Sequence, residues 1–147
     1  MFAPEVWRAR RKIADAFPAT ERRRLAPLRD RVFIGAAASP AVRRSYAEPA
    51  AAPMRHLQAA FVEARVVHAA YAKEGGELSR RRLEPHALVI NWPAWYLLAH
   101  DHLRGEPRTF RLDRFASVEV EADTFRPWPR QRVLDLLAFP GVTLDRL

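Results

Sequence analysis

The chain has no cysteine among its 147 residues. A disulfide, a thiol nucleophile and a thiolate metal site are therefore excluded, and this composition fits a reducing compartment. Long apolar runs are also missing, because the longest, such as residues 94–99, fall far short of the roughly 20 residues that cross a bilayer. Basic residues stand near the start, where a signal peptide would need its apolar stretch. We therefore expect a cytoplasmic protein with no membrane association.

Residues that carry catalysis are scarce as well. The serines are Ser39, Ser45, Ser79 and Ser117, and none has the sequence context of a nucleophile elbow. Paired carboxylates, a glycine-rich phosphate loop and a HExxH pattern are all absent. The run His100-Asp101-His102 has the spacing of metal ligands, but without a cysteine or a clear carboxylate partner we favour exposed histidines. We expect no enzymatic activity, no metal and no cofactor.

Charge is plentiful, and it is mostly of one sign. The chain has 25 basic and 17 acidic residues, a net charge of +8, and only two of the basic residues are lysines. Arginine matches the geometry of phosphate, which favours a polyanionic partner, although an Arg-rich and Ala-rich composition also arises in GC-rich genomes. The excess of basic residues lies outside residues 65–125, because that segment has 9 basic and 9 acidic residues. An anion site on this segment therefore needs its arginines gathered on one face.

The segment from residue 65 to residue 121 has the pattern of an antiparallel sheet. Runs of β-branched, aromatic and aliphatic residues alternate with turn residues such as Gly75-Gly76. The predicted strands cover residues 65–72, 88–90 with the residues before them, 95–98, 109–112 and 117–121. Alternation along the fourth of these strands predicts that Phe110 faces inward and Arg111 faces solvent.

Helical patterns flank these strands. Helices are predicted over residues 4–17, 20–25, 54–64 and 130–138, with a short strand over residues 31–34. In residues 54–64, the apolar side chains of Leu57, Ala60, Phe61 and Ala64 share one face. Residues 36–53 are rich in alanine, proline and serine and predict a linker or a loosely packed loop, with one turn near residues 42–46.

An ordered set of residues in the predicted sheet resembles the WYL domain family. It consists of Pro85, the tripeptide Trp95-Tyr96-Leu97 and the run Phe110-Arg111-Leu112-Asp113-Arg114 with Phe115. The resemblance covers about residues 54–125. It implies an α+β fold with a small five-stranded antiparallel Sm-like, SH3-type β-barrel, N-terminal helices and a short C-terminal helix. The implied divisions are a helical and linker segment (1–53), the barrel with its leading helix (54–125) and a C-terminal helical extension (126–147).

The same resemblance implies a ligand-sensing domain of a transcription regulator. The ligand would be a single-stranded oligonucleotide or a nucleotide, bound by arginines and tyrosines that line a groove. Carried over to this sequence, the site residues are Tyr71, Arg82, Tyr96, Arg111 and Arg114, with His86 at the border of the groove. Guanidinium groups would hold phosphates and tyrosine rings would stack on bases.

Two alternatives remain open. Arg111 and Arg114 could pair with Asp113, Glu84 or Glu119 and only stabilise the fold, with Tyr71 and Tyr96 as core aromatics. The whole domain could instead be an interaction or dimerisation module, and a homodimer is our expectation. Residues 1–53 do not have the pattern of a winged helix-turn-helix, so DNA recognition is expected from an attached or partner DNA-binding domain.

Overall fold

In the computed structural model, the chain divides into two compact units, Met1–Asp30 and Arg31–Leu147. The structure describes residues 26–138, so the helices predicted over residues 4–17 and 20–25 lie outside the described residues. In the first unit, residues 26–29 are helical. The second unit carries the predicted sheet.

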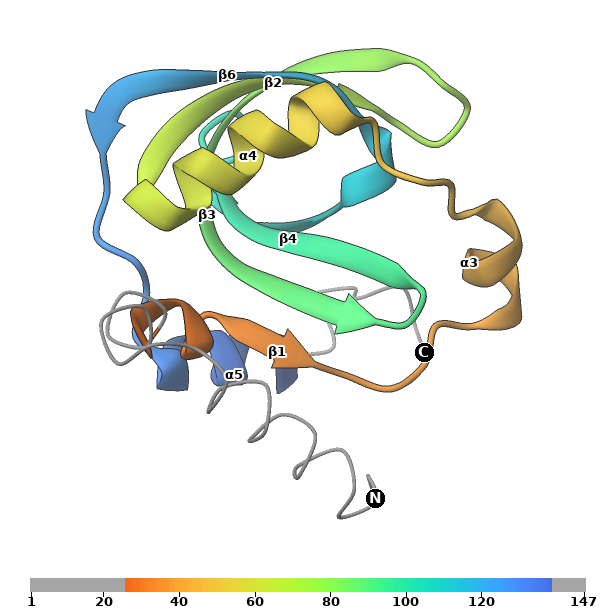
Figure 1. The fold of residues 1–147 in the computed structure, drawn as a ribbon, viewed down its shortest axis with the longest axis horizontal. Helices are drawn as coiled ribbons and strands as arrows, with labels where there is room; N and C mark the ends of the chain where they lie inside the picture. The colour runs from red at the N-terminus through yellow and green to blue at the C-terminus, as the bar shows by residue number, and fades with distance from the viewer. Residues whose placement is uncertain (1–25, 139–147) are drawn as a thin grey trace. The chain divides into compact units, whose positions relative to one another are not determined.

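The second unit has an α+β fold built on one six-stranded sheet (Figure 1). Its elements in chain order are β1 (Val32–Ile34), α3 (Pro40–Ser45), α4 (Ala51–Glu63), β2 (Arg65–Ala72), β3 (Leu78–Asn91), β4 (Ala94–Asp101), β5 (Glu106–Arg111), the 3₁₀ helix η1 (Leu112–Arg114), β6 (Phe115–Thr124) and α5 (Arg130–Ala138). The predicted bounds of β2 are confirmed at both ends, and α5 begins at the predicted residue, Arg130. Helix α4 begins three residues before the predicted position, and it packs against β6, β2 and β3.

Local chemistry explains where α4 ends and which face it buries. Ala64 adopts the left-handed conformation (φ 52°), and its N–H donates to the carbonyl oxygen of Ala60. This geometry closes the last helical turn. The buried side chains of the helix include Leu57, Ala60 and Phe61, as the apolar stripe predicted.

The strands pair in the order β5-β4-β3-β2-β6, and all of these pairs are antiparallel. Strand β3 pairs with β2 through residues 78–83 and with β4 through residues 83–91. Strand β1 pairs in parallel with β3 over residues 88–90. Because β4 already holds one edge of β3 there, β1 takes the other edge, beyond the end of β2.

The expected closed barrel is not formed by these pairings. Within residues 26–138, no strand pairing joins β5 to β6. The chain passes from β5 into β6 through η1 instead of a hairpin, and the backbone N–H of Arg111, at the end of β5, donates to the hydroxyl of Tyr71. The sheet is therefore open, with β5 and β6 at its ends.

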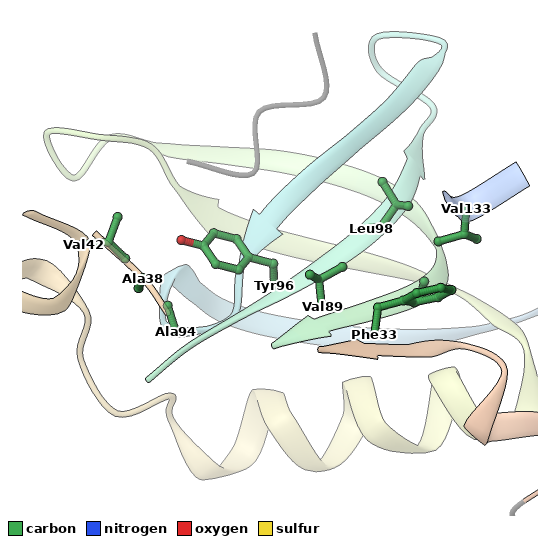
Figure 2. Packing of buried hydrophobic residues seen from close by; sticks show 9 residues of the cluster. Phe33, Ala38, Val42, Val89, Ala94, Tyr96, Leu98 and Val133 are labelled. Carbon is green, nitrogen blue, oxygen red and sulfur yellow. The ribbon is translucent and has the colours of Figure 1, made fainter. Parts of the chain in front are cut away.

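One apolar cluster contains residues of the sheet, of the segment before β2 and of the helix after β6. Its buried members are Phe33, Ala38, Val42, Ala87, Val89, Ala94, Tyr96, Leu98 and Val133 (Figure 2). Val133 brings α5 onto the sheet and is 1% exposed. The C-terminal helix thus covers apolar surface of its own chain.

The predicted linker is ordered in this structure. Ala38 is 1% exposed, and its N–H donates to the carbonyl oxygen of Trp92 at 3.0 Å. Ser39 then caps α3 by accepting a hydrogen bond from the N–H of Val42 at 3.3 Å. Helix α3 (Pro40–Ser45) overlaps the turn predicted near residues 42–46.

Candidate ligand-binding site

Arg111 stands at the end of β5 and is buried, with 5% of its surface exposed. Its guanidinium group forms a two-point ion pair with Asp113, with Nε 3.0 Å from Oδ1 and Nη2 2.7 Å from Oδ2. It also donates to the hydroxyl and carbonyl oxygens of Ser45, each at 3.0 Å. The prediction of a solvent-facing Arg111 is wrong, because β5 ends here and the last residue of α3, Ser45, together with Tyr46 after it, contacts the side chain.

Tyr71 on β2 lies beside Arg111 and is 9% exposed. Its hydroxyl accepts a hydrogen bond from the backbone N–H of Arg111 at 3.0 Å and also contacts the side chain of Arg114. The ring meets Phe110 and Phe115 edge to face, with centroids 5.0 and 5.2 Å apart. Burial raises the pKa of Tyr71 above its ordinary value. The hydroxyl is satisfied within the fold, as the core-aromatic alternative describes.

Tyr96 on β4 lies deeper, with 3% of its surface exposed. Its backbone neighbours across the sheet are Val89 on β3 and Arg111 on β5, and its ring belongs to the apolar cluster of Figure 2. Tyr71, Tyr96, Arg111 and Arg114 therefore gather where β5 runs into η1. Of these four residues only Arg114 keeps intermediate exposure.

Arg82 on β3 belongs to a second, more exposed group. Its Nε and Nη2 atoms lie 3.0 and 2.9 Å from the two carboxylate oxygens of Glu121, and Nη2 lies 2.9 Å from Asp123. These carboxylates raise the pKa of Arg82, and the hydrogen bond from Arg82 is the main cause that lowers the pKa of Glu121. The guanidinium group of Arg82, which is predicted to bind phosphate, is thus already paired with two carboxylates.

His86, also on β3, is 1% exposed. Its ring stacks on Trp128 with a centroid distance of 3.7 Å and an interplanar angle of 2°. The backbone N–H of Trp128 donates to Nδ1 of His86 at 3.1 Å. The proton of the imidazole ring is therefore on Nε2, which lies 3.2 Å from Glu84. Burial is the largest cause that lowers the pKa of His86 to about 3, and the charge of Arg31 adds to it. The contact with Glu84 is therefore a hydrogen bond of a neutral imidazole.

A buried arginine that the sequence did not single out fixes the region behind His86. Arg31 is 7% exposed and donates to the carbonyl oxygens of His86, Phe61 and Pro85 at 2.9, 2.6 and 2.6 Å. Phe61 lies in the last turn of α4, where a cation satisfies orphan carbonyl groups. Burial lowers the pKa of Arg31 to about 10. This arginine is a structural tie between β1, α4 and β3.

Two grooves lie beside these groups. The polar groove, of about 350 Å³, is formed by β2, β3 and β6 and is lined by His68, Ala69, Ala70, Arg80, Arg81, Ser117 and Glu119. The apolar groove, of about 310 Å³, is formed by α4 with the sheet and η1 and is lined by Met54, Leu57, Gln58, Phe61, Leu88, Trp95 and Leu112. Trp95 is 36% exposed, whereas Leu97 is fully buried.

Residues 53–120 match the WYL domain model. The chain carries a WYL domain. Among solved structures, the chain is similar to proteasome accessory factor B/C (PafBC) of Arthrobacter aurescens, with 22% sequence identity and a TM-score of 0.45. That similarity covers 65% of this chain and 15% of the other, so this chain spans only a small part of the length of PafBC.

The WYL tripeptide has three different environments in this domain. Trp95 lines the apolar groove, Tyr96 fills the apolar cluster, and Leu97 is fully buried. The Arg-x-x-Arg segment is likewise divided, because Arg111 is buried in an ion pair while Arg114 is partly exposed. Tyr96, Leu97 and Arg111 are thus buried in the fold, whereas Trp95 and Arg114 remain partly exposed.

Sequence reasoning missed Arg80, which lines the polar groove of the WYL domain. The signal was available, since Arg80 and Arg82 are two residues apart on one strand and therefore share a face. It was obscured by Arg81 between them, which points to the other face and pairs with the buried Asp101 at 2.8 Å.

The weak metal-ligand pattern is accounted for by other contacts. Asp101 pairs with Arg81 and accepts a hydrogen bond from the N–H of Leu103, while the rings of His100 and His102 lie 5.1 Å apart. Within residues 26–138, no cluster of three or more potential ligands suited to a metal ion was found. In the same residues, none of the helices has the length and apolar character needed to cross a bilayer.

Proposed function

We propose that this WYL domain is the regulatory, ligand-sensing part of a transcription regulator and that it acts in the cytoplasm without catalysing a reaction. The observation that carries the proposal is the WYL match over residues 53–120, which spans most of α4 and nearly the whole antiparallel sheet. DNA recognition would come from an attached or partner helix-turn-helix domain. The ligand that we propose is a single-stranded oligonucleotide or a nucleotide.

Exposure divides the six proposed site residues by role. Arg82 and Arg114 retain contact with solvent and are proposed to meet phosphate, with Arg82 exchanging its carboxylate partners for the ligand. The buried residues, Tyr71, His86, Tyr96 and Arg111, are proposed to position the strands around the site. We therefore expect electrostatic attraction to dominate binding, with little stacking on tyrosine.

Fluorescence anisotropy with a short single-stranded DNA at several salt concentrations tests this proposal. Affinity should fall as salt rises, with a log–log slope of about 0.7 per phosphate neutralised. Arg114→Gln should flatten this slope by just under one contact. Tyr71→Phe keeps the ring but removes the hydroxyl that accepts from the N–H of Arg111 and contacts Arg114, so affinity should fall modestly while the slope stays the same. If the folded wild-type chain binds no oligonucleotide or nucleotide in a salt-dependent way, the sensing proposal fails.

A second function, that of an interaction or dimerisation module, is favoured by exposed apolar side chains. Ile34, Trp92 and Trp95 are 57%, 71% and 36% exposed, and Ile34 and Trp95 both neighbour Ile90 across the sheet. Exposed apolar patches of this kind mark association surfaces. Sedimentation velocity at tens of micromolar tests this function, for which we expect a homodimer. A monomer would count against it. Trp92→Ser should shift the homodimer toward the monomer.

A further inference from the structure

The polar groove arises from small side chains on a central strand. On β2, Ala70 has Arg80 of β3 as its neighbour on one side and Ser117 of β6 on the other. Side chains that neighbour one another across strands share a face of the sheet. The methyl group of Ala70 lies between longer side chains of β3 and β6, which leaves a hollow. Its lining includes Ala70 together with Arg80, Ser117 and Glu119. The volume of about 350 Å³ lies within the roughly 300–1,000 Å³ of small-molecule sites.

Arg80 differs from the other strand arginines in its charge environment. In β2 to β6 the arginines are Arg65, Arg80, Arg81, Arg82, Arg108 and Arg111. Five of them pair with a carboxylate, namely those of Glu63, Asp101, Glu121, Glu106 and Asp113. Arg80 is exposed and has no ion-pair partner among residues 26–138. Among these strand arginines, Arg80 is thus the one with no described carboxylate within ion-pair distance.

The opposite side of the groove offers different chemistry. Ser117 and Glu119, both exposed on β6, place a hydroxyl and a carboxylate across β2 from the cation. Two strand spacings, roughly 9 to 10 Å, separate the backbones of β3 and β6 at this level. A ligand that fits these groups is therefore anionic at one end and carries an N–H donor at the other, with a flat middle that lies over Ala70.

We propose that the polar groove binds one phosphorylated nucleotide with an amino-bearing base. Arg80 holds the phosphate through its paired N–H groups. Ser117 donates a hydrogen bond from its hydroxyl to the nucleotide, and Glu119 accepts one from the exocyclic amine of the base. The choice of a nucleotide rests on the proposed function. The preference for an anion at Arg80 rests on the groove alone.

Isothermal titration of the full chain with AMP, adenosine, UMP and inorganic phosphate tests the assignment. AMP should bind at least ten-fold more tightly than adenosine, which lacks the phosphate. It should also bind several-fold more tightly than UMP, whose base has no exocyclic amine, and Glu119→Ala, which removes the acceptor, should abolish most of this second difference. Inorganic phosphate should bind more weakly than AMP and compete with it. Equal affinity for AMP and adenosine overturns the proposal.

Two variants locate the site, with one matched control. Arg80→Gln should weaken AMP binding at least ten-fold, and Ala70→Leu should weaken it by filling the hollow. Arg104→Gln removes the same charge from the exposed β4–β5 turn and should leave the affinity unchanged. Circular dichroism and a thermal melt confirm that each variant is folded. An Arg80→Gln variant that is folded and binds AMP like the wild type overturns the proposal.

Oligonucleotide binding separates this inference from the proposed function. If the wild type binds single-stranded DNA and Arg80→Gln leaves that binding and AMP binding unchanged, the groove assignment fails while the sensing function stands. If AMP binding depends on Arg80 but no oligonucleotide binds, the groove assignment stands for a free nucleotide. If neither AMP nor an oligonucleotide binds, both proposals fail.

Discussion

The two faces of β3 treat neighbouring arginines in opposite ways. On one face, Arg81 is 7% exposed and pairs with Asp101, which is fully buried. On the other face, Arg80 lies in solvent beside the polar groove and Arg82 shares two carboxylates while 32% exposed. The number of arginines in a strand therefore does not by itself make the strand a ligand site. Its charges become available only where the fold supplies no carboxylate.

Removing the carboxylate of the buried face should have the largest effect. Asp101→Ala leaves Arg81 buried without its partner and also removes the acceptor for the N–H of Leu103. Breaking a buried ion pair from one side costs about 3–5 kcal/mol of unfolding free energy. Urea denaturation at pH 7 measures this loss, which for a domain of this size could leave the chain largely unfolded.

A matched control sits directly across the sheet. Glu106 on β5 is the cross-strand neighbour of Asp101, and its partner Arg108 is 43% exposed at a distance of 3.7 Å. Because exposed pairs contribute about 0–1 kcal/mol, Glu106→Ala should be nearly neutral. Equal losses for the two variants would contradict the difference that we draw between buried and exposed arginine pairs.

Stability should also fall with acidity, because His86 is buried in its neutral form. Its pKa is about 3 when folded, against an ordinary value of 6.5, so between these values the unfolded chain binds one more proton. The stabilisation is complete above pH 6.5 and is lost as the pH falls toward 3. From pH 7 to pH 5 the expected loss is about 2 kcal/mol in urea denaturation.

The matching variant is His86→Asn, which removes the titrating ring. It should be less stable at pH 7, and its unfolding free energy should change by less than 1 kcal/mol between pH 7 and pH 5. The lowered pKa of Glu121 acts in the same direction, but only below its ordinary value of 4.5, outside this window. A wild-type chain equally stable at pH 5 and pH 7 would mean that His86 is not buried as described.

Local pattern predicted the elements of this fold well and their partners poorly. The bounds of β2, the start of α5 and the buried stripe of α4 follow from alternation and helical periodicity. The parallel pairing of β1 with β3 joins residues more than 50 positions apart. A closed barrel was predicted from resemblance, whereas η1 and the Tyr71 hydroxyl take the place of a further strand pair at the end of β5.

The candidate site shows the same limit at the level of single side chains. Alternation along β5 could not predict that Ser45, 66 positions away, would accept hydrogen bonds from Arg111 through its hydroxyl and carbonyl oxygens. Nor could it predict that Trp128, beyond the sheet, would stack on His86. The faces of Arg80 and Arg82 were predictable from period two, but which of them is paired depends on where Glu121 of β6 falls in the register.

The smallest effect is expected for the paired arginine of the exposed face. Arg82→Gln removes the hydrogen bonds to Glu121 and Asp123, yet 32% of the Arg82 side chain is exposed and Asp123 is 70% exposed. Salt screens such pairs, so the loss should be about 0.2–1 kcal/mol in dilute buffer and should shrink in 1 M salt. Urea denaturation at both salt concentrations measures it, and Arg81→Gln, whose larger loss should persist in salt, is the comparison. A loss for Arg82→Gln as large and as salt-independent as that for Arg81→Gln would show that the exposed network is as structural as the buried pair, and that Arg82 cannot exchange its carboxylates for a phosphate.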